Sequence, residues 1–587
     1  MLGRARGVAE PKSTGRRNPR WQVVRLAVFF IISAVILRLW QLQVLDHSAY
    51  AKLSEGQQAA YELLTPERGK IFATEKSAEG GQELVPLAVN TDAYFIYANP
   101  SLITDPAAAA KALAEPLGKT EEELMPVLNK PTDPYEPLLH RAGPEAANAI
   151  RALNIPGIEM ITERERFYPN NNIGSHVLGF VSYKNDALVG QYGLEGTLNK
   201  DLAGILGSVS SIESPGGVWI TLGDRDLAPA IDGSDVVLTI DWVVEFRVCK
   251  ELASWVQRHG ASGGSVIVMD PKTGAVIAMC GSPDFNPNVY NETSKITNFN
   301  NPALFLDYEP GSVMKGLTMA AAVDQQKVSP NSTYNDTGEV LFGKSVIKNS
   351  DNKAHGIQTM TQVLEESLNT GAIYAMRQIG VQVFRKYLED FGLGSTTGVE
   401  LDGEAAGNLH SLYDSNEIYA ATASFGQGIT ATPLQMVTAY AAIANGGKLM
   451  RPYLVKEIRH SDGTTETHSS KVVRQVISSK TAALVSGMLV RVVTNGHGKK
   501  AAVTGYVIAG KTGTAQIPRH DGKGYEDGST IGSFIGFGPV SDPKFAMIVR
   551  IDRPKDVQYA ESSAAPLFGD LAKFILQYYE VPPSSAY

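Results

Sequence analysis

Two short apolar runs in the middle of the chain constrain its fold more than any other feature. Residues Ser265–Met269 and Ala275–Cys280 are apolar at nearly every position, and the turn-forming sequence Asp-Pro-Lys-Thr-Gly joins them. Two such runs across a short turn are typical of a β-hairpin. Because the apolar residues do not alternate with polar ones, both faces of the hairpin must be buried. We therefore predict that the hairpin lies in a central sheet that carries helices on both faces.

The elements around this hairpin indicate an α+β domain over residues 233–587. A strand is expected at Val236–Ile240 and a helix at Trp242–Arg258. A further helix should begin at Thr432-Pro433 and end at Asn445-Gly446-Gly447, because Thr and Pro favour the first turn and Gly follows the last. The later elements are expected as strands at Tyr506–Ala509, Ser533–Phe537 and Phe545–Ile551 and a helix at Pro566–Tyr579. This order predicts one antiparallel central sheet flanked by helices.

The N-terminus combines a basic segment with an apolar one. Residues 1–25 hold seven Arg or Lys against one Glu, and the apolar block Leu26–Leu37 follows. Twelve residues rise only about 18 Å, short of the roughly 30 Å hydrocarbon core, unless the flanking arginines reach the interface. We expect an uncleaved single transmembrane helix at 23–44 in the inner membrane, a cytoplasmic tail at 1–22 and everything later outside the cytoplasm. A cleaved signal peptide and a buried helix are the alternatives.

Residues 45–232 carry no recognisable catalytic pattern. Alanine-rich helical runs at Pro106–Leu117 and Pro144–Leu153 alternate with short β-type runs such as Ala93–Tyr97. A chain of 587 residues is too long for one core. We interpret this part as an elongated pedestal domain of mixed structure that supports the rest.

Composition excludes several kinds of site. The net charge of −8 gives no general case for nucleic-acid binding, and the ten histidines show no metal-ligand spacing, so neither a metal nor a cofactor is expected. The two cysteines, Cys249 and Cys280, are too few for a disulfide framework or a Cys-rich metal site. Their apolar surroundings predict that both are core residues.

A serine and a lysine three residues apart are candidate catalytic groups. Ser312 and Lys315 lie in the sequence Glu-Pro-Gly-Ser-Val-Met-Lys at the start of an apolar helix. Residues at i and i+3 share a helix face, so the amine can reach the hydroxyl. The helix N-terminus favours developing negative charge there. A serine beside an amine is a recognised nucleophile, although a single pair of this kind is common by chance.

Two later stretches supply partners for this pair. Ser367 and Asn369 put a hydroxyl and an amide on one short turn. The run Lys511-Thr512-Gly513-Thr514 follows a strand-type segment. There the glycine would allow close approach of a substrate backbone, while Lys511 offers positive charge. In this order and spacing, the three motifs together indicate one serine acyl-transfer site.

The ordered set resembles that of the penicillin-binding proteins and serine β-lactamases. Within that superfamily the chain is similar to the class B penicillin-binding proteins, monofunctional peptidoglycan DD-transpeptidases, of the division (FtsI-like) type. Further stretches that carry the likeness are Leu37–Gln43, Arg68–Ile71, Gly193–Gly196, Ser424–Gly428, Thr432–Gln435 and Ala509–Ala515. The chain departs from the family at Phe72–Glu75, where an Asp-Arg-Asn-Gly type turn is usual, and at Gly496-His497-Gly498, where Gly-Thr-Gly is usual.

The resemblance implies a role for each motif residue. Ser312 would attack the carbonyl between two terminal D-alanines, with Lys315 as the base, and burial and the nearby positive charge of Lys511 would both lower the pKa of that base. The remaining expectations are that Ser367 relays a proton to the leaving D-alanine, that Asn369 holds the substrate amide and Lys315, that Lys511 and Thr512 bind the terminal carboxylate, and that the N–H groups of Ser312 and Thr514 form the oxyanion hole.

The resemblance also implies partners and leaves alternatives. Stem peptides would be donors and acceptors, β-lactams covalent inhibitors, and a membrane glycan polymerase and division proteins the associates of the anchor and pedestal. An elongation-type transpeptidase is the main alternative to the septal role. A β-lactamase that deacylates through Glu404 and a β-lactam sensor or inactive scaffold are further alternatives.

Overall fold

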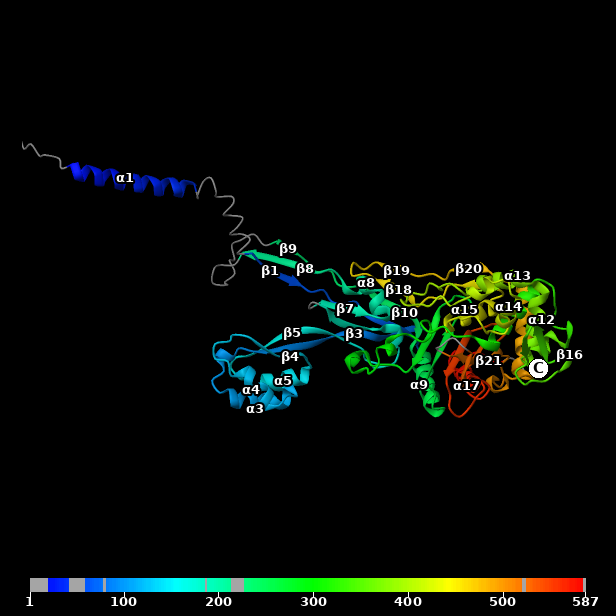
Figure 1. Ribbon diagram of the computed structural model, residues 1–587. Helices are drawn as coiled ribbons and strands as arrows, with labels where there is room; N and C mark the ends of the chain where they lie inside the picture. Colours follow the sequence, from blue (N-terminus) through cyan, green and yellow to red (C-terminus); the bar gives the residue numbers. More distant parts are fainter. Residues whose placement is uncertain are drawn as a thin grey trace, which may run out of the picture. The chain divides into compact units, whose positions relative to one another are not determined.

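The structure is a computed structural model that describes residues 19–41, 59–77, 81–184, 187–212, 226–519 and 524–583 (Figure 1). The chain forms two compact units. The first contains Met1–Pro66 and Ile205–Ile231, and the second contains Glu67–Gly204 and Asp232–Tyr587.

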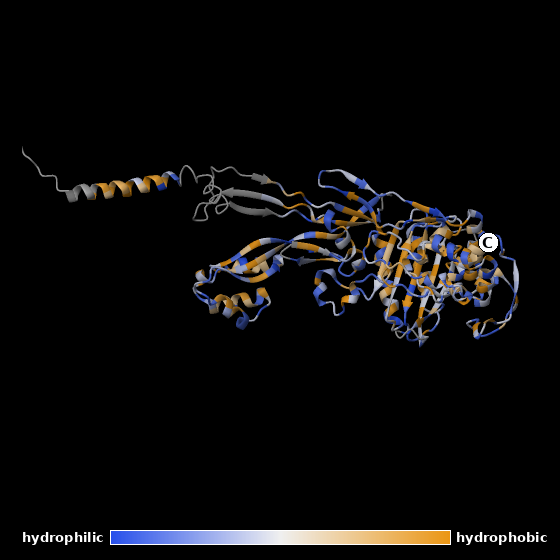
Figure 2. Cartoon of the chain, turned by 45° about the horizontal axis from the view of Figure 1, so that its top comes forward, coloured by the Kyte–Doolittle hydropathy of each residue, from blue (hydrophilic) through white to orange (hydrophobic). Residues whose placement is uncertain are grey.

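In its described residues, the first unit contains helix α1 and a small antiparallel sheet. Helix α1 runs over Pro19–Trp40, and Figure 2 shows it hydrophobic over much of its length. Within the described residues, no helix combines the length and the apolar character needed to cross a membrane, so the predicted anchor at 23–44 is not confirmed. The sheet has the order β1-β8-β9, with β1 at Ala59–Leu64, β8 at Gly207–Ile212 and β9 at Asp226–Ala228.

A seven-stranded sheet forms one part of the second unit. Its order is β19-β18-β10-β2-β3-β4, and β5 also pairs with β3. The strands are β2 (Ile71–Lys76), β3 (Gln82–Ala98), β4 (Glu136–Ala142), β5 (Ile158–Phe167), β10 (Asp235–Asp241), β18 (Val455–Arg459) and β19 (Thr465–Thr467). Helices α3 (Pro106–Leu117), α4 (Glu121–Leu128) and α5 (Pro144–Leu153) share one apolar core with β3 and β4. The two predicted helices of this region have the predicted bounds.

A buried charged cluster joins three segments of the second unit. Glu195 is fully buried and receives Arg68 Nε at 2.7 Å and Arg166 Nε at 2.7 Å. The hydroxyl of Tyr168 donates to the same carboxylate at 3.3 Å. Burial alone would raise the pKa of Glu195, but the guanidinium groups of Arg166 and Arg68 outweigh it and hold that pKa below its ordinary value. The carboxylate is therefore a charged anchor among three distant segments.

The predicted central sheet is confirmed. Five antiparallel strands have the order β12-β11-β23-β22-β21, and the hairpin β11–β12 pairs with a strand near the C-terminus. The strands are β11 (Gly263–Met269), β12 (Val276–Ser282), β21 (Ala509–Pro518), β22 (Tyr525–Gly538) and β23 (Phe545–Asp552). The predicted strand Tyr506–Ala509 was wrong, because β21 begins at Ala509 and the Lys-Thr-Gly run lies inside it.

Helices cover both faces of the sheet, as the apolar hairpin required. Val266 and Val268 face a core shared with α9 (Trp242–Arg258) and α17 (Ala564–Tyr578). Ile267 and Met269 belong to the core of the opposite face, which also contains the buried residues of α10 (Met314–Asp324), α15 (Pro433–Ala444) and α16 (Ser479–Thr494). Successive residues of one strand thus enter different cores, which accounts for the absence of polar alternation.

Sequence signals determine several helix ends. Helix α9 has the predicted bounds, and the side chain of Asp241 accepts the backbone N–H groups of Val243 and Val244. Thr432 caps α15 in a capping box with Gln435, so Pro433 becomes the first residue. Asn445 ends that helix, as predicted.

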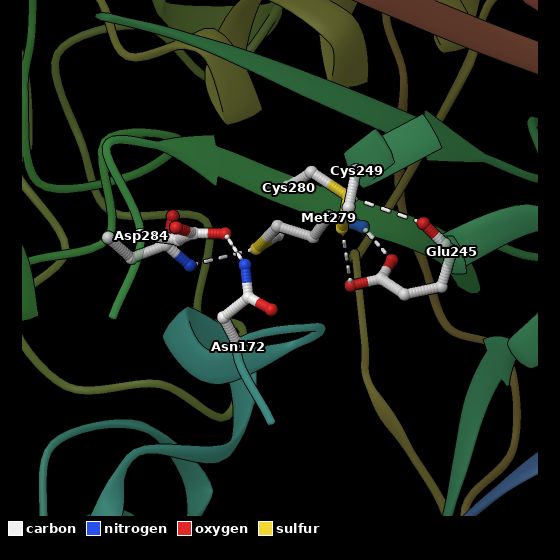
Figure 3. The surroundings of a disulfide bond; sticks show 7 residues. Asn172, Glu245, Cys249, Met279, Cys280 and Asp284 are labelled. Carbon is white, nitrogen blue, oxygen red and sulfur yellow. Dashed lines mark hydrogen bonds between the residues drawn. A yellow bond between two sulfur atoms is a disulfide. The ribbon is translucent and has the colours of Figure 1, made fainter. Parts of the chain in front are cut away.

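The two cysteines form a disulfide that the sequence did not predict. Cys249 on α9 and Cys280 on β12 have their Cα atoms 5.2 Å apart, because α9 folds back over the hairpin strand (Figure 3). Cys280 is buried, as expected, whereas Cys249 is only partly buried. The bond joins a covering helix to the edge strand of the central sheet.

A buried carboxyl group lies beside the disulfide. Glu245 Oε2 accepts the N–H of Met279 at 2.8 Å, and Oε1 lies 3.6 Å from Cys249 Sγ (Figure 3). Burial raises the pKa of Glu245 to about 8. Because the sulfur of a disulfide carries no hydrogen, a protonated Glu245 is the donor in the contact with Cys249.

Candidate active site

The candidate nucleophile lies on a short turn that leads into a buried helix. Ser312 belongs to the 3₁₀ turn η5 (Gly311–Val313), which continues directly into α10. Every residue from Met314 to Val323 is buried, so α10 passes through the core and takes Lys315 with it. Lys315 is 1% exposed, whereas Ser312 is partly exposed. The predicted position of Ser312 at the helix start is confirmed.

Glycines allow this turn to approach strand β21. A Cβ atom on Gly513 would lie 2.9 Å from both the carbonyl oxygen of Pro310 and Cγ1 of Val313. A Cβ atom on Gly426 would lie 2.2 Å from the carbonyl oxygen of Gly311, whose own φ of +63° also favours glycine. The nucleophile turn therefore packs directly against the Lys-Thr-Gly segment, and β21 is an edge strand of its sheet.

Ser367 connects the two lysines of the site. Lys315 Nζ donates to the Ser367 carbonyl oxygen at 2.5 Å and to its Oγ at 3.2 Å. Lys511 Nζ donates to the same Oγ at 3.0 Å and to the Thr512 carbonyl oxygen at 3.1 Å. Ser367 has a φ of +55°, an uncommon conformation for a residue other than glycine. All three motifs of the sequence thus converge on one hydroxyl.

Burial decides the electrostatics of this cluster. Burial lowers the pKa of Lys315 well below its ordinary value, and the positive charge of Lys511 lowers it further. Burial also lowers the pKa of Lys511, to about 7. The sequence led us to expect both causes, and the structure shows that burial is the larger one. A neutral Lys315 beside a serine hydroxyl is a competent base.

Two expected contacts differ from the structure. The amide of Asn369 donates to the carbonyl oxygen of Lys348 at 2.8 Å, and no hydrogen bond joins it to Lys315 among the described residues. Likewise, the described side chains show no hydrogen bond between Ser312 and Lys315. Catalytic hydrogen bonds often tighten only when substrate binds.

A cleft of about 360 Å³ opens above the cluster. The sequence-predicted residues Ser312, Ser367, Thr512 and Thr514 line it. The other lining residues are Ser350, Asp351, His355, Glu366, His497, Tyr559 and Glu561. The polar character of the segment around His355 was visible in the sequence, and His497 lies at a departure from the family pattern. No sequence pattern marked Tyr559 and Glu561 as site residues, because only the fold brings their segment to the cleft.

Glu404, the candidate deacylating residue of a β-lactamase, is not part of this cleft. Its carboxylate accepts the backbone N–H groups of Thr397 at 2.7 Å and Gly398 at 3.1 Å. It is not among the residues that line the cleft. These contacts give Glu404 a structural role in its loop.

Comparisons with known proteins agree with this geometry. The penicillin binding protein transpeptidase domain family matches residues 264–573, and the penicillin-binding protein dimerisation domain family matches residues 63–238. Stage V sporulation protein D of Bacillus subtilis is 33% identical over 95% of this chain and 84% of its own length. Peptidoglycan D,D-transpeptidase FtsI of Escherichia coli is 29% identical over 96% of this chain and 91% of its own.

A solved structure shows the same fold with an inhibitor. Penicillin binding protein 3 of Mycobacterium tuberculosis complexed with aztreonam matches with a TM-score of 0.68 and 26% identity, over 89% of this chain and 98% of that one. The buried lysines around one serine, the family matches and these relatives lead to one conclusion. The chain belongs to the class B, FtsI-like penicillin-binding proteins and is a serine peptidoglycan D,D-transpeptidase.

Proposed function

We propose that Ser312 is the acylated nucleophile and Lys315 its general base. The observation that carries this proposal is the shared hydroxyl of Ser367, which contacts both buried lysines. Neutral Lys315 takes the proton of Ser312 as its Oγ attacks the carbonyl carbon between two terminal D-alanines. Ser367 relays that proton from Lys315 to the nitrogen of the departing D-alanine. Lys315 is then neutral again, and the stem peptide is held as an ester on Ser312.

The other motif residues bind the substrate. Lys511 and Thr512 bind the terminal carboxylate, and the backbone N–H groups of Ser312 and Thr514 bind the developing oxyanion, each worth roughly 3–4 kcal/mol. Asn369 binds the substrate amide in place of its present partner, the Lys348 carbonyl oxygen. An amine from a neighbouring stem peptide then attacks the ester, which completes the cross-link. The reaction with a β-lactam stops at the ester on Ser312.

The cellular role is septal wall synthesis at the inner membrane. The similarity to FtsI of Escherichia coli supports the division type, and elongation is the alternative. The basic N-terminus and the apolar α1 support an anchor at 23–44, with a cytoplasmic tail at 1–22, a pedestal at 45–232 and the transpeptidase domain at 233–587 outside the cytoplasm. Because α1 alone falls short of a membrane span, its flanking arginines would have to reach the interface. A membrane glycan polymerase and division proteins are the proposed partners.

Labelling with a fluorescent penicillin tests the site. The wild-type protein should carry the label on Ser312, as located by mass spectrometry, and Ser312→Ala should lose it. Ser350→Ala, at the rim of the same cleft, is the matched control and should keep full labelling. Covalent labelling of Ser312→Ala would contradict the assignment. For the cellular role, depletion should produce filaments, and spheres would instead indicate elongation.

A further inference from the structure

One histidine of the catalytic cleft has no role in the steps above. His497 follows α16 and lines the cleft together with Ser312. Its backbone N–H donates to the carbonyl oxygen of Glu365 at 3.4 Å, and a Cβ atom on Gly496 would lie 2.4 Å from that same oxygen. The close packing at Gly496 therefore holds His497 beside the turn that carries Ser367.

A carboxylate orients this histidine. Nδ1 of His497 lies 3.4 Å from Glu561 Oε2. In a neutral imidazole whose Nδ1–H donates to this carboxylate, Nε2 keeps its lone pair. Glu561 also lines the cleft, and its segment is attached to β21, because the N–H of Ala560 donates to Thr514 Oγ1 at 3.1 Å. The pair thus bridges the two walls of the cleft, one next to Ser367 and one next to Thr514. Both side chains are about half exposed.

The carboxylates that line the cleft favour the approach of a cationic substrate. Glu366 and Glu561 line it, as does Asp351, which accepts His355 Nε2 at 3.0 Å. None of the described lining residues is Arg or Lys. The other charged groups near His497 are Glu365, paired with Arg491 at 2.9 Å, and the adjacent Lys499 and Lys500. An ammonium group entering from solvent therefore meets carboxylates before it meets the buried lysines.

The two half-reactions differ by one proton. In acylation, the Ser312 proton passes through Lys315 and Ser367 to the leaving amine, so Lys315 ends neutral. The acceptor, however, arrives mainly as an ammonium ion at neutral pH and must lose one proton before its nitrogen can attack. A second proton then returns to Ser312 Oγ as the ester bond breaks and the amide bond forms. The Lys315–Ser367 relay can return this second proton, but the first needs another base.

We propose that His497, oriented by Glu561, takes that first proton from the acceptor ammonium and passes it to solvent. This inference rests on the proposed function of Ser312 and concerns only the second half-reaction. Nε2 of His497 gains the proton, the neutral acceptor nitrogen attacks the ester carbonyl carbon, and the Ser312 Oγ–C bond breaks. The other amine proton goes to Ser312 Oγ, and His497 returns its proton to water.

Full-chain wild-type, His497→Gln and Glu561→Gln proteins test the proposal, with His355→Gln as the control for loss of a cleft histidine. A benzoyl-D-alanyl thioester forms the acyl-enzyme, and D-alanine is the acceptor whose amide product is counted against hydrolysis. Acylation by fluorescent penicillin reports separately on Ser312 and on folding. A general base contributes typically 10²–10⁴-fold.

We expect His497→Gln to label with penicillin within about twofold of wild type but to form amide product at least tenfold more slowly at pH 7. The deficit should shrink toward pH 10, where the acceptor amine becomes neutral by itself. Glu561→Gln should show a smaller deficit with the same pH trend, and His355→Gln none. Unchanged amide formation in His497→Gln, or a deficit that is independent of pH, would overturn the proposal. Loss of penicillin labelling at Ser312 in the wild type would instead overturn the proposed function.

Discussion

The buried carboxyl group beside the disulfide makes the stability of the catalytic domain depend on pH. Glu245 is 2% exposed, and its pKa of about 8 compares with an ordinary 4.5. The folded state therefore binds this proton more tightly than the unfolded state does. Its contribution to stability is fully present below pH 4.5, falls as the pH rises toward 8, and then changes no further.

The size of the effect follows from the two pKa values. A rise from 4.5 to about 8 corresponds to about 5 kcal/mol over the whole range, because each pH unit is worth about 1.4 kcal/mol. Between pH 5 and pH 8 the expected loss is about 3–4 kcal/mol. For a cooperative unit of about 350 residues this is a shift of about 4–5 °C in Tm.

Replacement of Glu245 by Gln should remove this dependence. Gln keeps an oxygen acceptor for the Met279 N–H and an amide donor toward Cys249, but it cannot ionise. Thermal unfolding of both proteins from pH 5 to pH 8 should give a Tm difference that grows by about 4–5 °C in favour of Glu245→Gln. Glu251→Gln, which replaces a half-buried carboxylate paired with Arg247 on the same helix, is the control and should track the wild type. A difference that stays constant within about 1 °C would refute the assignment of a buried, protonated Glu245.

Three further changes test the site and its support. Lys511→Ala should slow acylation by carboxylate-bearing β-lactams by about 10²-fold or more. It should also move the acidic limb of the acylation rate to higher pH, because loss of the Lys511 charge raises the pKa of Lys315; an unmoved limb would contradict this coupling. Arg68→Ala should lower stability by about 3–5 kcal/mol in thermal unfolding, since it leaves the fully buried Glu195 with one guanidinium less, and an unchanged Tm would argue against a buried charge there. Gly513→Ala should reduce penicillin acylation at least tenfold, because its Cβ would lie 2.9 Å from the Pro310 carbonyl oxygen, and full activity would show that the turn can shift freely.

Local sequence determined much of the scaffold. The hairpin predicted at 265–280 and the bounds of α9 followed from sequence patterns that act within a few residues. The position of β21 did not follow, because the run at 506–508 is as apolar as a strand but has no neighbouring strand to pair with. Strand pairing with β22 begins only at Ala509, and that partner is a tertiary feature.

Some features of the site were likewise predictable from the sequence, and others required the tertiary structure. The residues Ser312, Ser367 and Lys511 were recognisable because short motifs preserve the chemistry of the reaction. The lowered pKa of Lys315 was expected, but only the structure shows that burial is its larger cause, because this depends on the burial of the whole of α10. The contact of Asn369 with Lys348 also depends on a strand 21 residues away.

The remaining contacts were not predicted because they join residues that are far apart in the sequence. Cys249 and Cys280 are 31 residues apart, and their bond requires α9 to fold over β12. His497 and Glu561 are 64 residues apart and meet only because the segment before α17 attaches to Thr514. The sequence by itself predicted the candidate acylation groups and the sheet that carries them. The tertiary structure decided how deeply the two lysines are buried and which segment forms the second wall of the cleft, because both depend on contacts between segments that are distant in the chain.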